Sequence, residues 1–178
     1  MANITPYGYR FSKKKKEMIS TMPIDLKFEF TFPDGFVLVI DTREQDGLFQ
    51  KLPKGLLVTR NTLQYGDYSI RGFELSVAIE RKNLDDFWSS LTTHRERFGN
   101  ELTALALYER KYILVEGVEH EALRPDLAGR KIHPNSIRQG VASIEAKLGI
   151  PVHYAASRAD AERWLLDILL KYYHFKCD

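Results

Sequence analysis

The segment from residue 66 to residue 86 constrains the fold more than any other part of the chain. Its pattern predicts a strand, a tight turn, a second strand and the start of a helix. Successive side chains of a strand alternate between its two faces. Val77 and Ile79 therefore share one face of the second strand, which we expect to lie in the core. Glu80 and Lys82 share the other face, so a carboxylate and an ammonium lie close together there.

Asp67 lies on the first of these two strands. A hairpin of this kind can bring its carboxylate beside that of Glu80, so that two carboxylates and the Lys82 ammonium meet at one point. Two carboxylates with vacant coordination positions suit Mg²⁺, which takes oxygen ligands and keeps several of its waters. The hairpin therefore predicts a site for a divalent cation.

The segments around the hairpin predict a mixed α/β fold. Phe36–Ile40 is a continuous apolar run, which is typical of a strand covered on both faces. Charged residues follow at its carboxyl end, where sites usually form in open α/β sheets. We expect further strands at 55–59, 112–115 and 151–154, helices capped by Asn83 and by Ser157, two more helices at 94–110 and 137–148, and an irregular connection at 119–131. This order favours a mixed sheet with helices on its faces.

Length and composition favour one folded domain preceded by an extension. The 178 residues are 44% hydrophobic and 28% charged, so a packed core is feasible. We expect residues 1–34 to form a partly flexible N-terminal extension, and residues 35–178 to form a single domain. Within the extension, residues 27–32 alternate in a way that is compatible with an edge strand, and Lys13–Lys16 form either a solvated surface or a flexible arm.

Several classes of function are disfavoured by what the sequence lacks. The net charge of +2 is too small to indicate nucleic-acid binding by itself. Cys177 is the single cysteine, which suits a reducing, intracellular setting in the cytoplasm, nucleoid or nucleus. No apolar run approaches the ~20 residues of a membrane span, so we expect no membrane partner. No glycine-rich phosphate loop is present, so we expect no nucleotide cofactor.

The charged residues are more specific in combination than one by one. This sequence resembles the XPF-type nuclease domain, which belongs to the PD-(D/E)XK restriction-endonuclease-like group. The motif of that domain is Gly-Asp, a gap, Glu-Arg-Lys, three residues and Asp. The resemblance extends from about residue 37 to residue 170. An upstream Asp-x-Arg-Glu belongs to the same family pattern. The matching residues in chain order are Asp41, Arg43, Glu44, Gly66, Asp67, Glu80, Arg81, Lys82 and Asp86.

The resemblance implies a restriction-endonuclease-like fold, in which helices flank a mixed central sheet. It also implies metal-dependent endonucleolytic hydrolysis of DNA, specific for branched, flap or fork structures, with a role in DNA repair. Many members carry tandem helix-hairpin-helix domains after the nuclease. Here the last predicted helix runs almost to Asp178, so we expect no such domain in residues 35–178, and the selection of substrate stays open.

On this reading Asp67, Glu80 and Lys82 are the catalytic residues. Asp67 and Glu80 would hold Mg²⁺ or Mn²⁺, and Asp41 would be either a further ligand or a supporting group. The cation would activate water and neutralise phosphate charge. Lys82 would orient that water and stabilise the transition state.

The remaining charged residues of the pattern have supporting roles. We expect Arg43 and Arg81 to hold the carboxylates or a phosphate. Glu44 is a further candidate for the metal site. Asp86 lies at a helix start, where either helix capping or a site role is compatible with the sequence.

Binding and assembly leave further alternatives. Arg95 and Arg97 either contact the DNA backbone or belong to a solvated face. The apolar stripes of the last two helices predict an isologous homodimer through Pro134–Leu148 and Ala159–Phe175, unless the sheet of the same chain covers them. Two other functions compete with a structure-specific nuclease: a non-catalytic DNA-binding or partner module of the same fold, and a sequence-specific nuclease.

Overall fold

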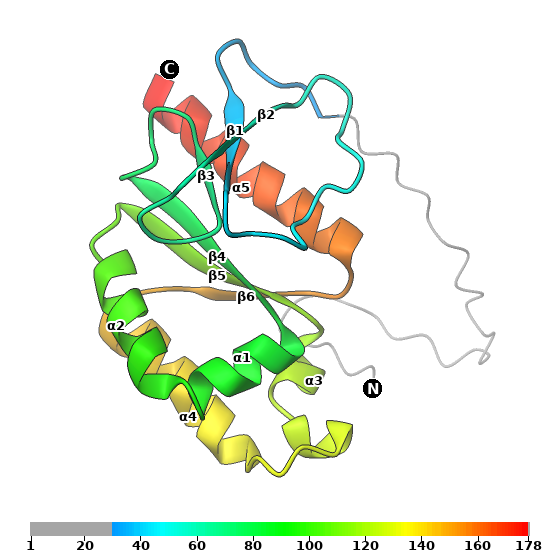
Figure 1. The fold of residues 1–178 in the computed structure, drawn as a ribbon, viewed down its shortest axis with the longest axis vertical. Helices are drawn as coiled ribbons and strands as arrows, with labels where there is room; N and C mark the ends of the chain where they lie inside the picture. The colour runs from blue at the N-terminus through cyan, green and yellow to red at the C-terminus, as the bar shows by residue number, and fades with distance from the viewer. Residues whose placement is uncertain (1–29, 178) are drawn as a thin grey trace, which may run out of the picture.

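A computed structural model describes residues 30–177 and shows one six-stranded sheet with helices on both faces (Figure 1). The strands are β1 (Val37–Asp41), β2 (Leu57–Asn61), β3 (Tyr68–Ile70), β4 (Val77–Asn83), β5 (Arg110–Glu116) and β6 (Val152–Ala155). The helices are α1 (Leu84–Leu91), α2 (Arg95–Leu105), α3 (Glu119–Ala122), the 3₁₀ helix η1 (Pro125–Ala128), α4 (Pro134–Ser143), the π-helical segment η2 (Ile144–Leu148) and α5 (Arg158–Cys177). In this part of the chain, no helix is both long enough and apolar enough to cross a membrane.

The sheet is mixed, with strand order β2-β1-β3-β4-β5-β6. β3 and β4 form an antiparallel hairpin, and β3 also runs antiparallel to β1. The other pairs, β1 with β2, β4 with β5, and β5 with β6, are parallel. This arrangement, with helices on both faces, confirms the restriction-endonuclease-like fold expected from the sequence.

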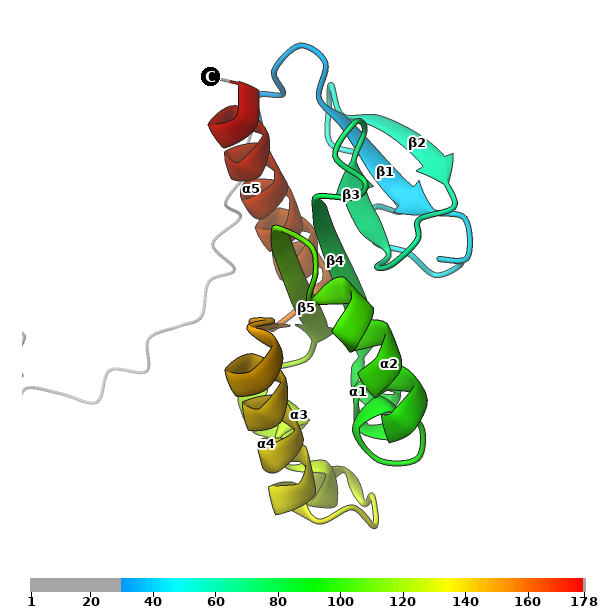
Figure 2. The same cartoon turned by 90° about the vertical axis from the view of Figure 1, so that its left-hand side faces the viewer.

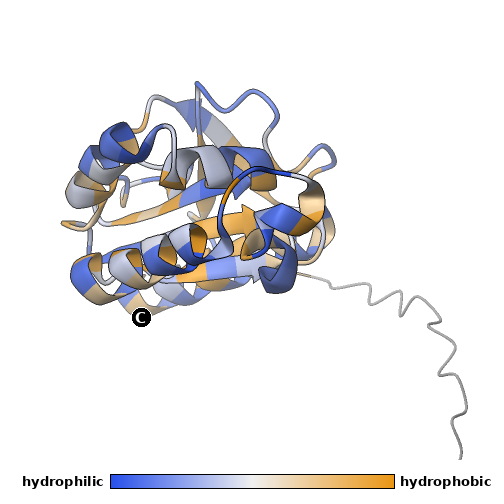
Figure 3. Cartoon of the chain, turned by 90° about the horizontal axis from the view of Figure 1, so that it is seen from below, coloured by the Kyte–Doolittle hydropathy of each residue, from blue (hydrophilic) through white to orange (hydrophobic). Residues whose placement is uncertain are grey.

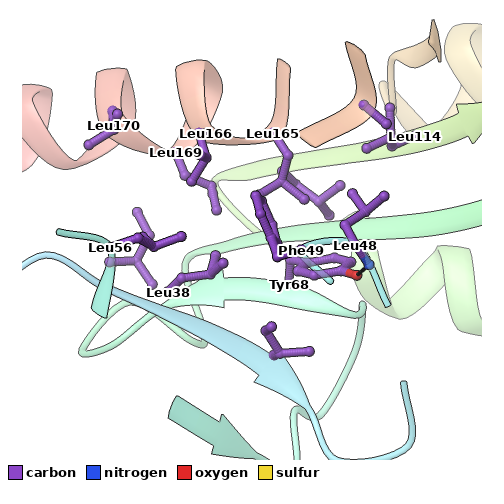
Figure 4. Packing of buried hydrophobic residues seen from close by; sticks show 14 of the residues in the cluster. Leu38, Leu48, Phe49, Leu56, Tyr68, Leu114, Leu165, Leu166, Leu169 and Leu170 are labelled. Carbon is purple, nitrogen blue, oxygen red and sulfur yellow. Dashed lines mark hydrogen bonds between the residues drawn. The ribbon is translucent and has the colours of Figure 1, made fainter. Parts of the chain in front are cut away.

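The alternation along β4 divides the core into two layers. Val77 and Ile79 pack with α5 on one face, and Ala78 packs with α1, α2 and α4 on the other. In Figure 2, α5 and α2 lie on opposite sides of β4 and β5. Figure 4 shows Leu165 and Leu169 of α5 packed over the sheet near Tyr68. Hydrophobic residues accordingly concentrate in the strands between the helical layers, with hydrophilic residues on the outer turns (Figure 3).

Several elements differ from the sequence-based expectation. The expected edge strand at 27–32 is wrong for residues 30–32, which form no strand. Instead Phe32 stacks between Phe30 and Phe36, with ring centroids 5.9 and 5.8 Å apart. Residues 27–29 and the basic run Lys13–Lys16 lie outside the described residues.

The helical connections also differ in detail. The segment expected to be irregular at 119–131 contains α3 and η1, each only four residues long. α2 ends at Leu105 rather than near Arg110, because Arg110 already begins β5. The helix expected at 137–148 begins earlier, at Pro134, and continues through η2 to Gly149, whose left-handed conformation ends it.

Candidate active site

The β3–β4 hairpin and α2 enclose a pocket of about 530 Å³. Asp67, Glu80 and Lys82 line it from the hairpin side. Residues of α2 line the opposite wall, and Arg43 lies where β1 has just ended. The pocket therefore brings together the three residues for which the sequence predicts a catalytic role, and we call it the catalytic pocket after that prediction.

Asp67 is fixed against β4 by its main chain. Its N–H donates to the carbonyl of Ile79 over 2.9 Å, and its carbonyl accepts from the N–H of Asp41 over 2.8 Å. Gly66 precedes it with φ of +79°, and a Cβ there would lie 3.0 Å from the Cβ of Ala78. Glycine is required at this position because both the backbone conformation and the close approach to β4 exclude a side chain. This is the physical basis of the Gly-Asp pair.

The carboxylates of Asp67 and Glu80 lie close enough in the pocket to repel each other when both are ionised. Burial, followed by the charge of Glu80, raises the pKa of Asp67 to about 8. The N–H of Arg81 opposes this rise, because it donates to Oδ2 of Asp67 over 2.7 Å. Near neutral pH the metal-free protein therefore holds Asp67 largely protonated.

Lys82 is oriented by its neighbours in the pocket. Its Nζ donates to Oε1 of Glu80 over 2.5 Å and lies 5.1 Å from the ring centroid of Phe98. Burial of the ammonium opposes its charge, but Glu80 and Asp67 outweigh burial and hold the pKa of Lys82 above its ordinary value. Lys82 thus stays a cation beside two carboxylates.

The donor set of the pocket suits a hard divalent cation. Among residues 30–177, no three His, Cys, Asp or Glu side chains lie close enough together to form a metal site. Asp67 and Glu80 provide two carboxylates, which matches the few protein ligands that Mg²⁺ takes while keeping its waters. A cation between them would also remove the repulsion that raises the pKa of Asp67.

Asp41 does not line the catalytic pocket. Its buried carboxylate accepts from Arg43 through the main-chain N–H over 2.8 Å and through Nε over 2.7 Å, and from the N–H of Leu63 over 2.6 Å. Burial raises its pKa, but these hydrogen bonds outweigh burial and hold the pKa below its ordinary value. Asp41 therefore anchors Arg43, whose guanidinium also donates to the carbonyl of Leu63 over 2.8 Å.

Arg81 and Glu44 lie behind the sheet rather than in the catalytic pocket. The alternation of β4 directs the Arg81 side chain to the α5 face, where its guanidinium donates to Glu116 and, over 3.2 Å, to Glu44. The expectation that Arg81 holds carboxylates therefore applies to this pair and not to the carboxylates of the pocket. Only the main-chain N–H of Arg81 reaches Asp67.

Asp86 takes part in capping α1. Its N–H donates to Oδ1 of Asn83 over 2.8 Å, and its carboxylate accepts from Nδ2 of Asn83 over 2.7 Å. This reciprocal pair satisfies a donor that the first turn of a helix leaves free. The capping role that the sequence left open for Asp86 is thus present, and Asp86 does not line the catalytic pocket.

The two arginines of α2 lie on different sides of the helix. Arg97 lines the catalytic pocket, while Arg95 lines a neighbouring groove between α2 and α4. Phe98 and Leu102 form a wall shared by the pocket and the groove. The sequence did not separate these two positions.

Glu101 is a pocket residue that the sequence reasoning missed. It lies one turn after Arg97 on α2, and the two side chains form an ion pair with 3.6 Å between Nε and Oε1. The i, i+4 spacing from Arg97 was the available signal, because such residues share one helix face.

We expect Asp67→Asn to stabilise the metal-free protein at high pH. The folded-state pKa of Asp67, about 8, lies above its ordinary value, so its ionisation destabilises the fold. The resulting loss of folding stability is absent near pH 4 and complete above pH 8. Each unit of difference between the folded and unfolded pKa corresponds to about 1.4 kcal/mol of stability. Asparagine should therefore raise the free energy of unfolding by about 2 kcal/mol or more at pH 9, and by little at pH 4.

Urea unfolding in the presence of a chelator, at both pH values, measures this effect. The exposed, isosteric Asp34→Asn is the matched control and should change stability by less than about 0.5 kcal/mol at both pH values. An Asp67→Asn protein with no gain at pH 9 relative to wild type would contradict the buried carboxylate pair.

Comparison with known proteins gives a family match and matches to solved structures, two of which are described here. The model of a family described as the ERCC4 domain matches residues 40–168. XPF from Aeropyrum pernix in complex with DNA has a TM-score of 0.59 and 23% identity, over 79% of this chain and 66% of that one. A second structure of XPF from Aeropyrum pernix has a TM-score of 0.56 and 22% identity, over 77% of this chain and 64% of that one. No curated protein sequence matches the chain.

These matches bear on different questions. The family match includes every motif residue from Asp41 to Asp86, whereas the structural matches, at under 25% identity, show the fold alone. The chain also spans slightly less than two thirds of the length of each matched structure.

Proposed function

Because this chain belongs to the ERCC4 domain family, we propose that it is an XPF-type, metal-dependent DNA endonuclease. Its substrates would be branched, flap or fork DNA, and its role would lie in DNA repair. The observation that carries the proposal is the convergence of Asp67, Glu80 and Lys82 in one pocket. A non-catalytic partner module would not need a buried, mutually repelling carboxylate pair, which destabilises the metal-free fold.

Asp67 and Glu80 are the residues that would hold the cation. Mg²⁺ or Mn²⁺, when bound, supplies Lewis acidity that activates water and neutralises charge on the phosphate. Asp67 must lose its proton to serve as a ligand, so cation binding and proton release are coupled. Asp41, whose oxygens are occupied by Arg43 and Leu63, would act as a support for Arg43.

Lys82 would orient water and stabilise the transition state. Its ammonium is compact and has three N–H donors, one of which donates to Glu80 over 2.5 Å. The other two are available to a water molecule or to a phosphate oxygen in the pocket. Because the amine stays protonated, Lys82 would act as an electrostatic group and not as a general base.

Two guanidinium groups at the edge of the pocket would hold the DNA backbone. The side chains of Arg43 and Arg97 are 66% and 73% exposed, so both can reach a phosphate outside the protein surface. Arg43 is anchored by Asp41, which limits its motion and favours a fixed phosphate contact. Arg95 would contact a neighbouring phosphate from the groove between α2 and α4.

Assembly and location remain predictions. The core of the same chain buries Ile137, Ile144 and Leu169, so the apolar argument for a homodimer through Pro134–Leu148 and Ala159–Phe175 is weaker than the sequence suggested. Val141, Trp164 and Ile168 stay only partly buried and would form the centre of such an interface. An intracellular location follows from the proposed DNA substrate.

Asp67→Asn, Glu80→Gln and Lys82→Ala should each reduce cleavage by about 10²-fold or more, because each removes a charge that acts on the cation or the phosphate. The assay compares linear, flap, fork and nicked DNA in Mg²⁺, with circular dichroism to confirm folding. Each variant should still bind DNA through its arginines. Wild-type cleavage by a folded Asp67→Asn protein would show that the catalytic site lies elsewhere.

DNA affinity should fall steeply with salt, because phosphate contacts by Arg and Lys release counterions from the DNA. Arg95→Ala and Arg97→Ala should weaken binding equally on all sequences and should each reduce the log-log salt slope by about 1. Fluorescence anisotropy with a chelator present measures binding without cleavage.

The control for this measurement is Lys171→Ala, which removes an exposed cation from α5, across the sheet from the catalytic pocket. It should leave the salt slope unchanged. A slope near zero for the wild-type protein would reject electrostatic binding of the DNA backbone.

A further inference from the structure

A charged cluster lies directly behind the catalytic pocket, on the α5 face of the sheet. We call it the back cluster, and its members are Glu44, Asp46, Arg81, Glu116 and Arg158. The Arg81 guanidinium binds Glu116 through Nε and binds Glu44 through a second nitrogen over 3.2 Å. The side chains of Glu44, Arg81 and Glu116 are only 9–17% exposed.

The back cluster joins segments that are distant in sequence. Glu44 follows β1, Glu116 ends β5, and Arg158 begins α5. Arg158 donates to the carbonyl of Asp46 over 3.2 Å, and its Nε lies 3.8 Å from Glu116. In Figure 1 the start of α5 accordingly lies beside the loop that follows β1. Arg81 of β4 lies at the centre of these contacts.

The position of Arg81 on β4 links the back cluster to the pocket. Arg81 stands between Glu80 and Lys82, whose side chains point the opposite way, into the pocket. The N–H of Arg81 also donates to the Asp67 carboxylate over 2.7 Å. A displacement of Arg81 would therefore move three pocket groups together: the carboxylate of Glu80, the ammonium of Lys82 and the donor to Asp67.

Stability alone gives little reason for such a cluster. Buried ion pairs are expensive to desolvate, and apolar residues of similar size often replace them at no loss of stability. Groups that hold metal ligands in place, in contrast, commonly change metal affinity 10–100-fold when they are removed. The back cluster has the geometry of such a support, because its central residue shares a backbone segment with Glu80.

We propose that the back cluster positions the divalent-cation site from the opposite face of the sheet. Arg81, clamped by Glu44 and Glu116, fixes the end of β4 so that Glu80, Lys82 and the Arg81 N–H keep their places around Asp67. Arg81, Glu44 and Glu116 are then positioning residues. The inference rests on the proposed function only in taking the pocket as a cation site.

The test measures Mn²⁺ binding to the DNA-free protein directly, with electron paramagnetic resonance as the readout. Glu116→Gln keeps the shape of the side chain but removes its charge, and Arg81→Lys keeps a charge but loses the two-pronged contact. Both should weaken Mn²⁺ binding by about 10- to 100-fold while circular dichroism stays unchanged. Glu116→Asp should bind Mn²⁺ more tightly than Glu116→Gln, because it restores the charge.

Glu109→Gln is the matched control. It also removes the charge of a carboxylate that contacts two side chains, Tyr172 over 3.0 Å and Lys176 over 2.7 Å. Those contacts lie near the other end of α5. We expect it to bind Mn²⁺ within about 2-fold of wild type. A second readout uses cleavage: the back-cluster variants should need more Mg²⁺ for half-maximal rate and should recover much of kcat at saturating Mg²⁺.

The outcomes separate this proposal from the proposed function. Wild-type Mn²⁺ affinity in folded Glu116→Gln and Arg81→Lys proteins would overturn the positioning role, as would an equal loss in Glu109→Gln or a wild-type protein that binds no Mn²⁺. If the variants lose Mn²⁺ as expected but the wild-type protein cuts no DNA, the positioning role stands and the nuclease proposal fails.

Discussion

The pairing of β3 with β4 holds the Asp67 and Glu80 carboxylates close together in a buried pocket. Burial together with the charge of Glu80 raises the pKa of Asp67 to about 8, so the metal-free arrangement destabilises the fold once both groups ionise. The pairing of β3 with β4 maintains it: Asp67 is bound to Ile79 through the main chain and to the N–H of Arg81 through its carboxylate. A cation between the carboxylates would convert this repulsion into binding free energy, because only the ionised pair attracts it.

The alternation of β4 assigns different tasks to the two faces of one strand. Glu80 and Lys82 face the pocket, whereas Arg81 faces α5 and holds Glu44 and Glu116. Consecutive residues of one motif thus have separate physical reasons for their identity. On the pocket side the proposed chemistry needs carboxylate and ammonium groups. On the other side the Arg81 guanidinium binds the strand to its neighbours through two carboxylates.

The features of the site that depend on short sequence patterns were predictable. The alternation from Val77 to Lys82 and the glycine before Asp67 were sufficient to place the hairpin and the face of each side chain. The contacts of Arg81 with Glu116 and of Asp41 with Leu63 were not predictable, because these partners lie 35 and 22 residues apart in sequence. Glu101 was missed for a related reason: its place in the pocket follows from how α2 packs on the sheet. The edge strand expected at 27–32 failed at residues 30–32, where aromatic stacking replaces strand pairing.

We propose that Asp67 and Glu80 bind one divalent cation in the pocket beside Lys82. Anomalous diffraction from crystals grown in Mn²⁺ tests it most directly, because manganese scatters anomalously and its peak can be located without a model of the site. We expect a single strong peak within ~2.5 Å of oxygens of both carboxylates, and its loss in Glu80→Gln crystals. A peak elsewhere on the molecule, or an empty pocket in crystals saturated with Mn²⁺, would contradict it.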